Sequence, residues 1–524
     1  MNKPSPAIIA QSAVRRLPRL ALLLFCVAYI LPGFLGRGPW KNADIAAFGT
    51  MRELAAGNTS WLHPLLLGQV GEFEALAPYW MGALAIKALP FLDPAFAVRI
   101  PFGLLLALTL LCTWYAVYYL ARSPQAQPVA FAFGGEASPV DYARAIADAA
   151  LLALIASLGL AQLSHETTPA LAQLGFTALA FYAVAASAYR NAWKVMGPAL
   201  GLVVGLAGLA LSGAPTVAAL LGAGSTLVAW GNAQSARPDN NPAHAWRWVL
   251  LTGGLTLAVA ALSWGLDLWR WRIEIPGLES PADRKEWRSV ARLLIWFAWP
   301  TWPLAAWTLW RWRRQLTSRH VALPLWFALV ALAATVTTTA SDRSLLLSLP
   351  PLAALAAFAL PTLKRSVASL IDWFTLLFFT GCAIIIWVIW IAMQTGMPRQ
   401  PAANVAKLAP GFEPSFSWLA FLAAALATLA WAWLVKWRAG RQRAAVWKSM
   451  VLPAGGATLC CYMVVDADAQ GALSETVDMP EWAYLATLSR PTDKNENVAL
   501  YKRVSVAAAG QGADPGTAPA RQRP

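Results

Sequence analysis

The chain has 524 residues, of which 58% are hydrophobic and only 13% charged, and its formal net charge is +15. Soluble domains carry about 25% charged residues, so this composition excludes a soluble globular protein. It also excludes disordered, collagenous, coiled-coil and disulfide-scaffold classes. Basic residues cluster in short turns beside apolar runs, as in Arg311-Trp312-Arg313-Arg314. That pattern orients spans in a membrane and does not indicate nucleic-acid binding.

The first apolar run, residues 17–36, follows Arg15, Arg16 and Arg19. Its length favours a retained signal anchor whose N-terminus lies in the cytoplasm. Since a spanning helix needs about 20 mostly apolar residues, the sequence predicts an all-α integral membrane protein of about thirteen spans. The other twelve are expected at residues 96–121, 146–163, 169–189, 195–212, 214–232, 247–269, 289–310, 321–339, 344–363, 367–394, 416–436 and 444–464.

The segment between the first two spans, residues 37–95, is expected to be an exterior loop with two helices in the membrane interface. Ile45, Phe48, Met51 and Ala55 stand about one turn apart, which predicts a short amphipathic helix over 43–56 that ends at Gly57-Asn58. Residues 79–89 predict a second short apolar helix, too short to span.

The charge of the turns sets the expected orientation. Most of the basic turns lie on the side of residue 1, whereas the short turns on the other side hold at most one basic residue each. The long exterior segments 37–95 and 270–288 also hold Lys and Arg, some of which are candidates for function. We therefore expect a bacterial inner-membrane protein with a transmembrane domain over 1–464, a small periplasmic region over 465–506 and a disordered tail over 507–524.

Ionisable residues near the membrane gather at the exterior face, where they are candidates for chemistry. Asp44 is either an ordinary helix N-cap or a base that deprotonates an acceptor hydroxyl. Glu72 and Glu74 are either solvated or bind a cation or an amino sugar. His165-Glu166, in a tight turn, suits acid–base chemistry or metal binding. Asp342-Arg343 is either a surface pair or a phosphate-binding site in which Arg343 holds the phosphate.

The order of motifs in the first ~120 residues resembles a known family. It runs through Gly57-Asn58-x-x-Trp61-Leu62-His63-Pro64, Phe73-Glu74, Tyr79-Trp80-Met81-Gly82-Ala83-Leu84 and Ala97-x-Arg99-Ile100-Pro101, and a later segment begins at Ser341-Asp342-Arg343 and ends at Pro350-Pro351-Leu352. This set is similar to the polyprenyl-phosphate-sugar-dependent glycosyltransferases of the GT-C fold. That group includes protein O-mannosyltransferases and the aminoarabinose transferase that modifies lipid A.

The resemblance implies a reaction in which an acceptor attacks the anomeric carbon of a sugar carried on a polyprenyl phosphate. Asp44 would act as base or help to bind a metal, with His165 and Glu166 as the other catalytic candidates. Glu74, Tyr79 and Trp80 would border the donor phosphate, and Arg343 would contact it. The expected partners are the lipid-linked sugar, an acceptor among lipid A, a glycan or a protein, and membrane lipids.

The chain departs from the family pattern at Ala75, where the family has a lysine. The charge for the phosphate would then come from Lys41, Lys87, Arg99 or Arg343. No cofactor is identified, and a divalent cation stays open, with Asp44 and Glu166 as candidate ligands. The five cysteines lie within or beside apolar runs without ligand spacing, so they predict neither zinc nor disulfides. Two other functions stay open: a lipid or polysaccharide flippase, and a degenerate, non-catalytic relative.

Overall fold

The computed structural model describes residues 5–35, 38–39, 42–66, 68–70, 75–187, 192–234, 242–269, 281–337, 341–408, 416–439, 445–468, 482–489 and 497–503. It divides into two compact units, residues 1–471 and 472–524. Within the second unit, the strands β3 (Trp482–Ser489) and β4 (Asn497–Arg503) form an antiparallel hairpin.

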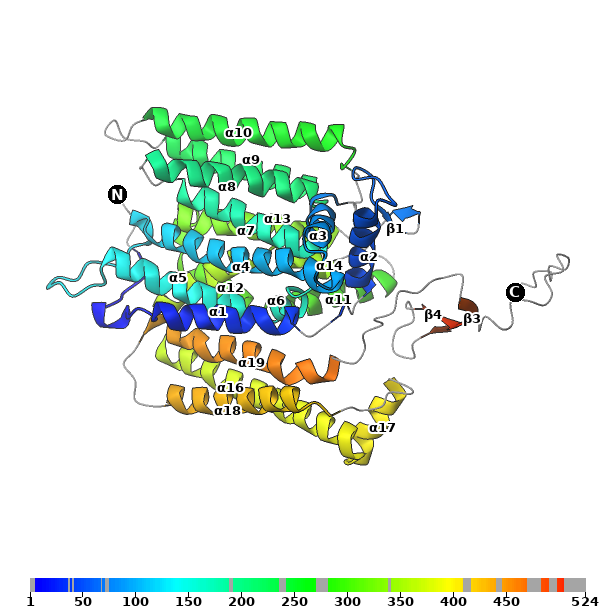
Figure 1. Ribbon diagram of the computed structural model, residues 1–524. Helices are drawn as coiled ribbons and strands as arrows, with labels where there is room; N and C mark the ends of the chain where they lie inside the picture. The colour runs from blue at the N-terminus through cyan, green and yellow to red at the C-terminus, as the bar shows by residue number, and fades with distance from the viewer. Residues whose placement is uncertain are drawn as a thin grey trace, which may run out of the picture. The chain divides into compact units, whose positions relative to one another are not determined.

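The first unit is a helix bundle, which confirms the predicted all-α membrane fold. Its long helices run side by side, and neighbours in the chain pack together, as α7 does with α8 and α9 with α10 (Figure 1). The helices that correspond to predicted spans are α1 (Arg19–Phe34), α4 (Pro94–Ala121), α7 (Pro169–Ala186), α8 (Ala192–Leu211), α9 (Pro215–Gln234), α10 (Pro242–Gly265), α13 (Arg319–Thr337), α16 (Arg365–Thr395), α18 (Trp418–Ala439) and α19 (Val451–Asp468).

Length and composition allow six of the described helices to cross a membrane: α4, α7, α10, α13, α16 and α18. Shorter apolar helices are α1, α8, α9 and the segment Leu349–Thr362. The number thirteen therefore stays a prediction.

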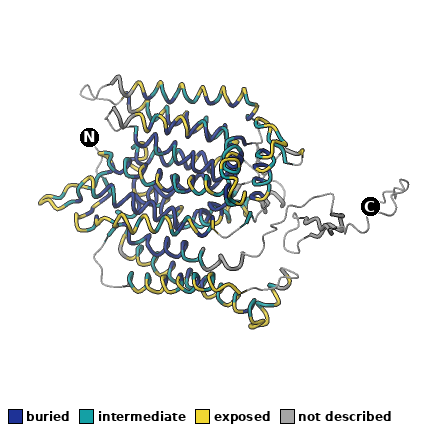
Figure 2. Tube along the Cα trace, viewed as in Figure 1, coloured by how far each residue is buried: buried dark blue, intermediate teal, exposed yellow. Residues whose placement is uncertain are grey.

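The exposed fractions of the side chains distinguish helices in the protein core from helices on an apolar surface. Almost every residue of α7 is buried, whereas α10 and α16 expose Leu250, Leu257 and Leu377 by 65% or more (Figure 2). A surface this apolar would associate or aggregate in water. In a membrane it faces lipid tails, which explains why α10 and α16 expose leucines.

Two helices cross one end of the bundle, where Figure 1 shows α2 (Asn42–Ala56) and α3 (Ala77–Ala88). They are the two helices predicted at 43–56 and 79–89. They pack on each other closely, because Gly82 has no side chain and Met51 occupies the space that a Cβ would fill. The chain that connects the two helices forms a small hairpin of β1 (Leu65–Leu66) and β2 (Gln69–Val70). We call this end of the bundle the site end.

Three predicted spans are wrong as single helices. Residues 146–163 divide into α5 (Pro139–Ile155) and α6 (Leu158–Leu163), residues 289–310 into α11 (Pro281–Phe297) and α12 (Thr301–Arg311), and residues 344–363 into α14 (Ser341–Leu346) and α15 (Leu349–Ala359). The short helix α17 (Arg399–Leu408), which follows α16, was not expected.

Each break has a local cause. The N–H of Leu158 donates to the carbonyl of Trp299 instead of to its own helix, which ends α5. Pro300 has no N–H to donate and separates α11 from α12. Pro350 and Pro351 stand in the first turn of α15, where a missing N–H is tolerated, and prevent a continuous helix from α14. The short pieces α6, α11 and α14 pack against one another at the site end.

The contact between α7 and α8 gives a test of this packing. A Cβ added at Gly205 would lie 2.8 Å from the backbone nitrogen of Ala180 and 3.0 Å from the carbonyl oxygen of Phe176. Backbone atoms cannot move aside as a side chain does, so we expect Gly205→Ala to destabilise the protein by about 1–3 kcal/mol. The measurement is the thermal unfolding midpoint of the purified protein in detergent.

Gly254→Ala in α10 is the matched control, since a Cβ there meets none of the described atoms within 4 Å. Alanine is the better helix former by about 1 kcal/mol, so this variant should be unchanged or more stable. Equal midpoints for the two variants would contradict the close approach of α7 and α8.

Candidate functional site

The centre of the site is the turn of residues 164–168, between α6 and α7. Its five residues are all polar, yet none is more than 8% exposed. Buried polar groups need partners, because burying one without a hydrogen bond costs about 1–3 kcal/mol or more. The partners come from α1, α2 and α14, and they define the site.

Asp44 lies in the first turn of α2 and is 4% exposed. Its Oδ1 accepts hydrogen bonds from the backbone N–H of Thr167 at 2.7 Å and from the Thr167 hydroxyl at 2.6 Å. The carboxylate also interacts electrostatically with Arg99 in the first turns of α4. Asp44 therefore joins the interfacial helix to the buried turn, across 123 residues of sequence.

Glu166 is the second buried carboxylate, and it faces the short helix α14. Its Oε2 lies 4.0 Å from a terminal guanidinium nitrogen of Arg343, and the two side chains are 1% and 15% exposed respectively. The backbone N–H of Arg343 donates to the carboxylate of Asp342 at 2.8 Å. The two predicted residues therefore make different contacts. Arg343 pairs with Glu166 in the buried turn, whereas Asp342 accepts a bond within its own helix.

His165 packs against the end of α1, between the rings of Tyr29 and Phe34, at centroid distances of 5.3 and 5.5 Å. Its Nε2 lies 3.0 Å from the carbonyl oxygen of Tyr29. A carbonyl only accepts, so Nε2 carries the hydrogen. In the neutral ring Nδ1 then accepts from the Ser164 hydroxyl at 3.4 Å. Gly33 leaves the space, because a Cβ there would lie 2.1 Å from the imidazole.

The remaining predicted residues are distributed around this centre. Tyr79 is buried in the first turn of α3. The indole of Trp80 donates to the carbonyl of Trp61 at 2.7 Å, and the exposed Lys87 lies over the Trp61 ring at 5.3 Å. Lys87 and Trp80 therefore meet at Trp61. Lys41, Glu72 and Glu74 lie outside the described residues.

The structure thus brings Asp44, Glu166 and Arg343 to the buried turn, with Arg99 in electrostatic interaction with Asp44. Thr167, which holds Asp44, was not singled out from the sequence. The signal for it was the run Ser164-His165-Glu166-Thr167-Thr168, five polar residues between two apolar helices. Within the described ranges, no three His, Cys, Asp or Glu side chains form a group suited to a metal ion. A divalent cation at Asp44 and Glu166 stays a prediction.

The site thus lies at one end of a helix bundle, where two buried carboxylates and two partly exposed arginines gather beneath α2 and α3. The comparison with solved structures confirms the GT-C fold that the resemblance implied. The chain is similar to ArnT from Cupriavidus metallidurans in the apo state, with a TM-score of 0.54 and 15% identity over 86% of this chain and 77% of ArnT. It is also similar to the same ArnT bound to undecaprenyl phosphate, with a TM-score of 0.53, 15% identity and the same coverage.

At sequence level, no family model and no curated protein matches the chain. An identity of 15% is too low to carry over individual residues, so the roles of the site residues rest on the geometry described above.

Thr167 and Thr168 provide a matched test of the buried turn. Thr167→Val removes the hydroxyl bond to Asp44, and a bond to a charged group contributes about 1.5–3 kcal/mol. Thr168 is as buried, but its hydroxyl has no hydrogen-bond partner among the described residues. We therefore expect Thr167→Val to lower the thermal unfolding midpoint and Thr168→Val to leave it unchanged or raise it. The reverse order would show that Thr167 does not hold Asp44.

Proposed function

We propose that this protein is a membrane glycosyltransferase that moves a sugar from a polyprenyl-phosphate carrier to an acceptor in the cell envelope, on the periplasmic face. The observation that carries the proposal is the buried Asp44, which Thr167 holds and which interacts with Arg99, together with Glu166 of the same turn, which pairs with Arg343 of α14. The ArnT structure with bound undecaprenyl phosphate supports the choice of carrier, because it shows that this fold can hold such a lipid.

The reaction needs a base and a cation, and the site offers both. An acceptor oxygen attacks the anomeric carbon of the carried sugar, a new carbon–oxygen bond forms, and the bond to the carrier phosphate breaks. Asp44 takes the acceptor proton. Thr167 engages Oδ1, so we assign the proton to Oδ2. A fixed hydrogen-bond pattern of this kind holds the carboxylate in one orientation, which is what general-base catalysis requires.

Negative charge develops on the leaving phosphate, and a preorganised cation stabilises it best. Arg343 and Arg99 are the candidates, since both belong to elements that meet at the turn. Arginine suits this part because its planar fork can bind two phosphate oxygens. The pair with Glu166 holds Arg343 in place until the donor arrives.

His165 takes a positioning role in this proposal. Both of its ring nitrogens bond within the protein, to Tyr29 and to Ser164, and its ring is enclosed by Tyr29 and Phe34. It fixes the turn against α1. Glu166, which is nearly inaccessible, orients Arg343.

Asp44→Asn tests the proposal most directly. Asparagine keeps an oxygen for the Thr167 bonds but cannot act as a base at neutral pH. We expect the release of undecaprenyl phosphate from undecaprenyl-phosphate-linked sugars to fall by about 10²–10⁴-fold. The measurement uses purified protein in membranes that supply acceptors, with a panel of carried hexoses and pentoses.

Glu53→Gln is the matched control. It removes a carboxylate from the same helix, at a side chain that bonds only locally to Asn58, at 3.0 Å, among the bonds described for it. Its rate should stay close to that of the wild type. Release that survives Asp44→Asn would move the base to Glu166, and no release from any donor by the wild type would favour a flippase or a non-catalytic relative.

A further inference from the structure

The helix α11 (Pro281–Phe297) presents a basic face at the site end that the proposed reaction does not use. Arg288 and Arg292 are exposed and stand four residues apart, so they project from the same side of the helix. Like charges four residues apart repel each other and so destabilise a helix. A stripe with this cost indicates a negatively charged partner.

The same face becomes apolar toward the end of the helix. Ile295, seven residues after Arg288, is 48% exposed, and the adjacent Trp296 is 53% exposed. The opposite side packs inward: Phe297 is 3% exposed, and its ring lies where a Cβ of Gly159 would be. The exposed face therefore carries cations first and then an aliphatic and an aromatic side chain, next to the point where the chain enters the bundle.

That order matches the cross-section of a membrane surface. In such an arrangement arginines would reach the headgroup phosphates while Ile295 and Trp296 lie at the boundary with the acyl chains, where long cationic side chains and tryptophan are favoured. A soluble anionic partner would account for the arginines, but it would not account for the exposed Ile295 and Trp296 next to them. Figure 1 shows α11 at the site end, and it packs on α6 and α14, the helices that position the buried turn and Arg343.

We propose that α11 binds anionic phospholipid headgroups of the leaflet at the site end, through Arg288 and Arg292. The lipid occupies the outer face of α11, while α6 and α14 occupy the inner one. Neither Arg288 nor Arg292 has a part in the proposed sugar transfer, so the inference holds whether or not the protein transfers sugar.

The test is a lipid titration of the full-length protein in neutral detergent, followed by native mass spectrometry, with phosphatidylglycerol and phosphatidylcholine as probes. We expect the wild type to prefer phosphatidylglycerol. In Arg288→Gln/Arg292→Gln, the affinity of the tightest phosphatidylglycerol site should fall about 30-fold, from ~1 kcal/mol for each basic residue near an anionic surface. Phosphatidylcholine binding should not change. Arg288→Lys/Arg292→Lys keeps both charges and should retain most of the affinity.

Arg399→Gln/Lys407→Gln is the control for net charge. It removes two basic residues from α17, another amphipathic helix. The proposal is overturned if this control loses as much affinity as the α11 variant, or if the α11 variant binds phosphatidylglycerol like the wild type. Binding is measured without donor or turnover, so a failure here leaves the glycosyltransferase proposal untouched, and the reverse is also true.

Discussion

A carboxylate removed from water must be matched by hydrogen-bond donors or a cation, and this requirement organises the site end of the bundle. Burial of an unmatched charge costs several kcal/mol. Thr167 donates hydrogen bonds to the carboxylate of Asp44, which also interacts with Arg99, and Arg343 pairs with the carboxylate of Glu166. Because both carboxylates meet the same five-residue turn, the interfacial helix α2 and the short helix α14 are tied to one point. The same interactions that stabilise this end also gather two carboxylates and two arginines near one turn.

The breaks in three predicted spans also shape the site end. A continuous span satisfies its own backbone, whereas a broken one leaves carbonyls and N–H groups that need other partners. The bond from Leu158 to the carbonyl of Trp299 joins two such breaks, and α6, α11 and α14 fill the space between them. Continuous hydropathy predicted single spans here, and those predictions are wrong. Departures from simple local rules are expected where a protein builds a site, and all three lie at the site end.

The sequence could predict the membrane bundle, the two interfacial helices and most helix ends, because these depend on composition, periodicity and local turn signals. It could not show that Thr167 bonds to Asp44, since a contact across 123 residues leaves no periodic trace. It could not show that Trp80 and Lys87 meet at Trp61, nor that the tight turn is fully buried. The acidic and basic candidates were visible as exceptions in an apolar chain, but their grouping depends on tertiary packing.

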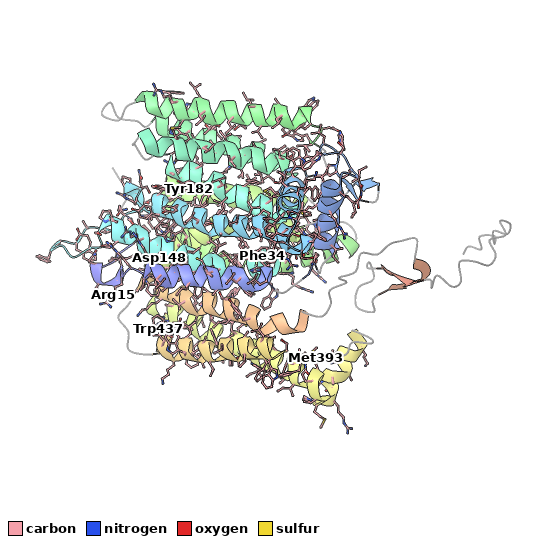
Figure 3. All side chains as sticks on the ribbon, in the orientation of Figure 1. Arg15, Phe34, Asp148, Tyr182, Met393 and Trp437 are labelled. Atoms are coloured by element: carbon pink, nitrogen blue, oxygen red, sulfur yellow. The ribbon has the colours of Figure 1, made fainter. Side chains whose placement is uncertain are left out.

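The other end of the bundle shows why a buried charge does not by itself mark a site. Figure 3 shows Arg15 and Asp148 there, far from Phe34 at the site end. Asp148 accepts from the indole of Trp114 at 2.8 Å and from the backbone N–H of Leu17 at 3.4 Å, and so joins α5 to α4 and to the segment just before α1. Asp372 pairs with Arg438 at 2.6 Å between α16 and α18. In each case one carboxylate joins neighbouring helices. At the site end, by contrast, two carboxylates and two arginines from separate elements gather near one turn. Among the described residues this is more charge than the joining of neighbouring helices requires.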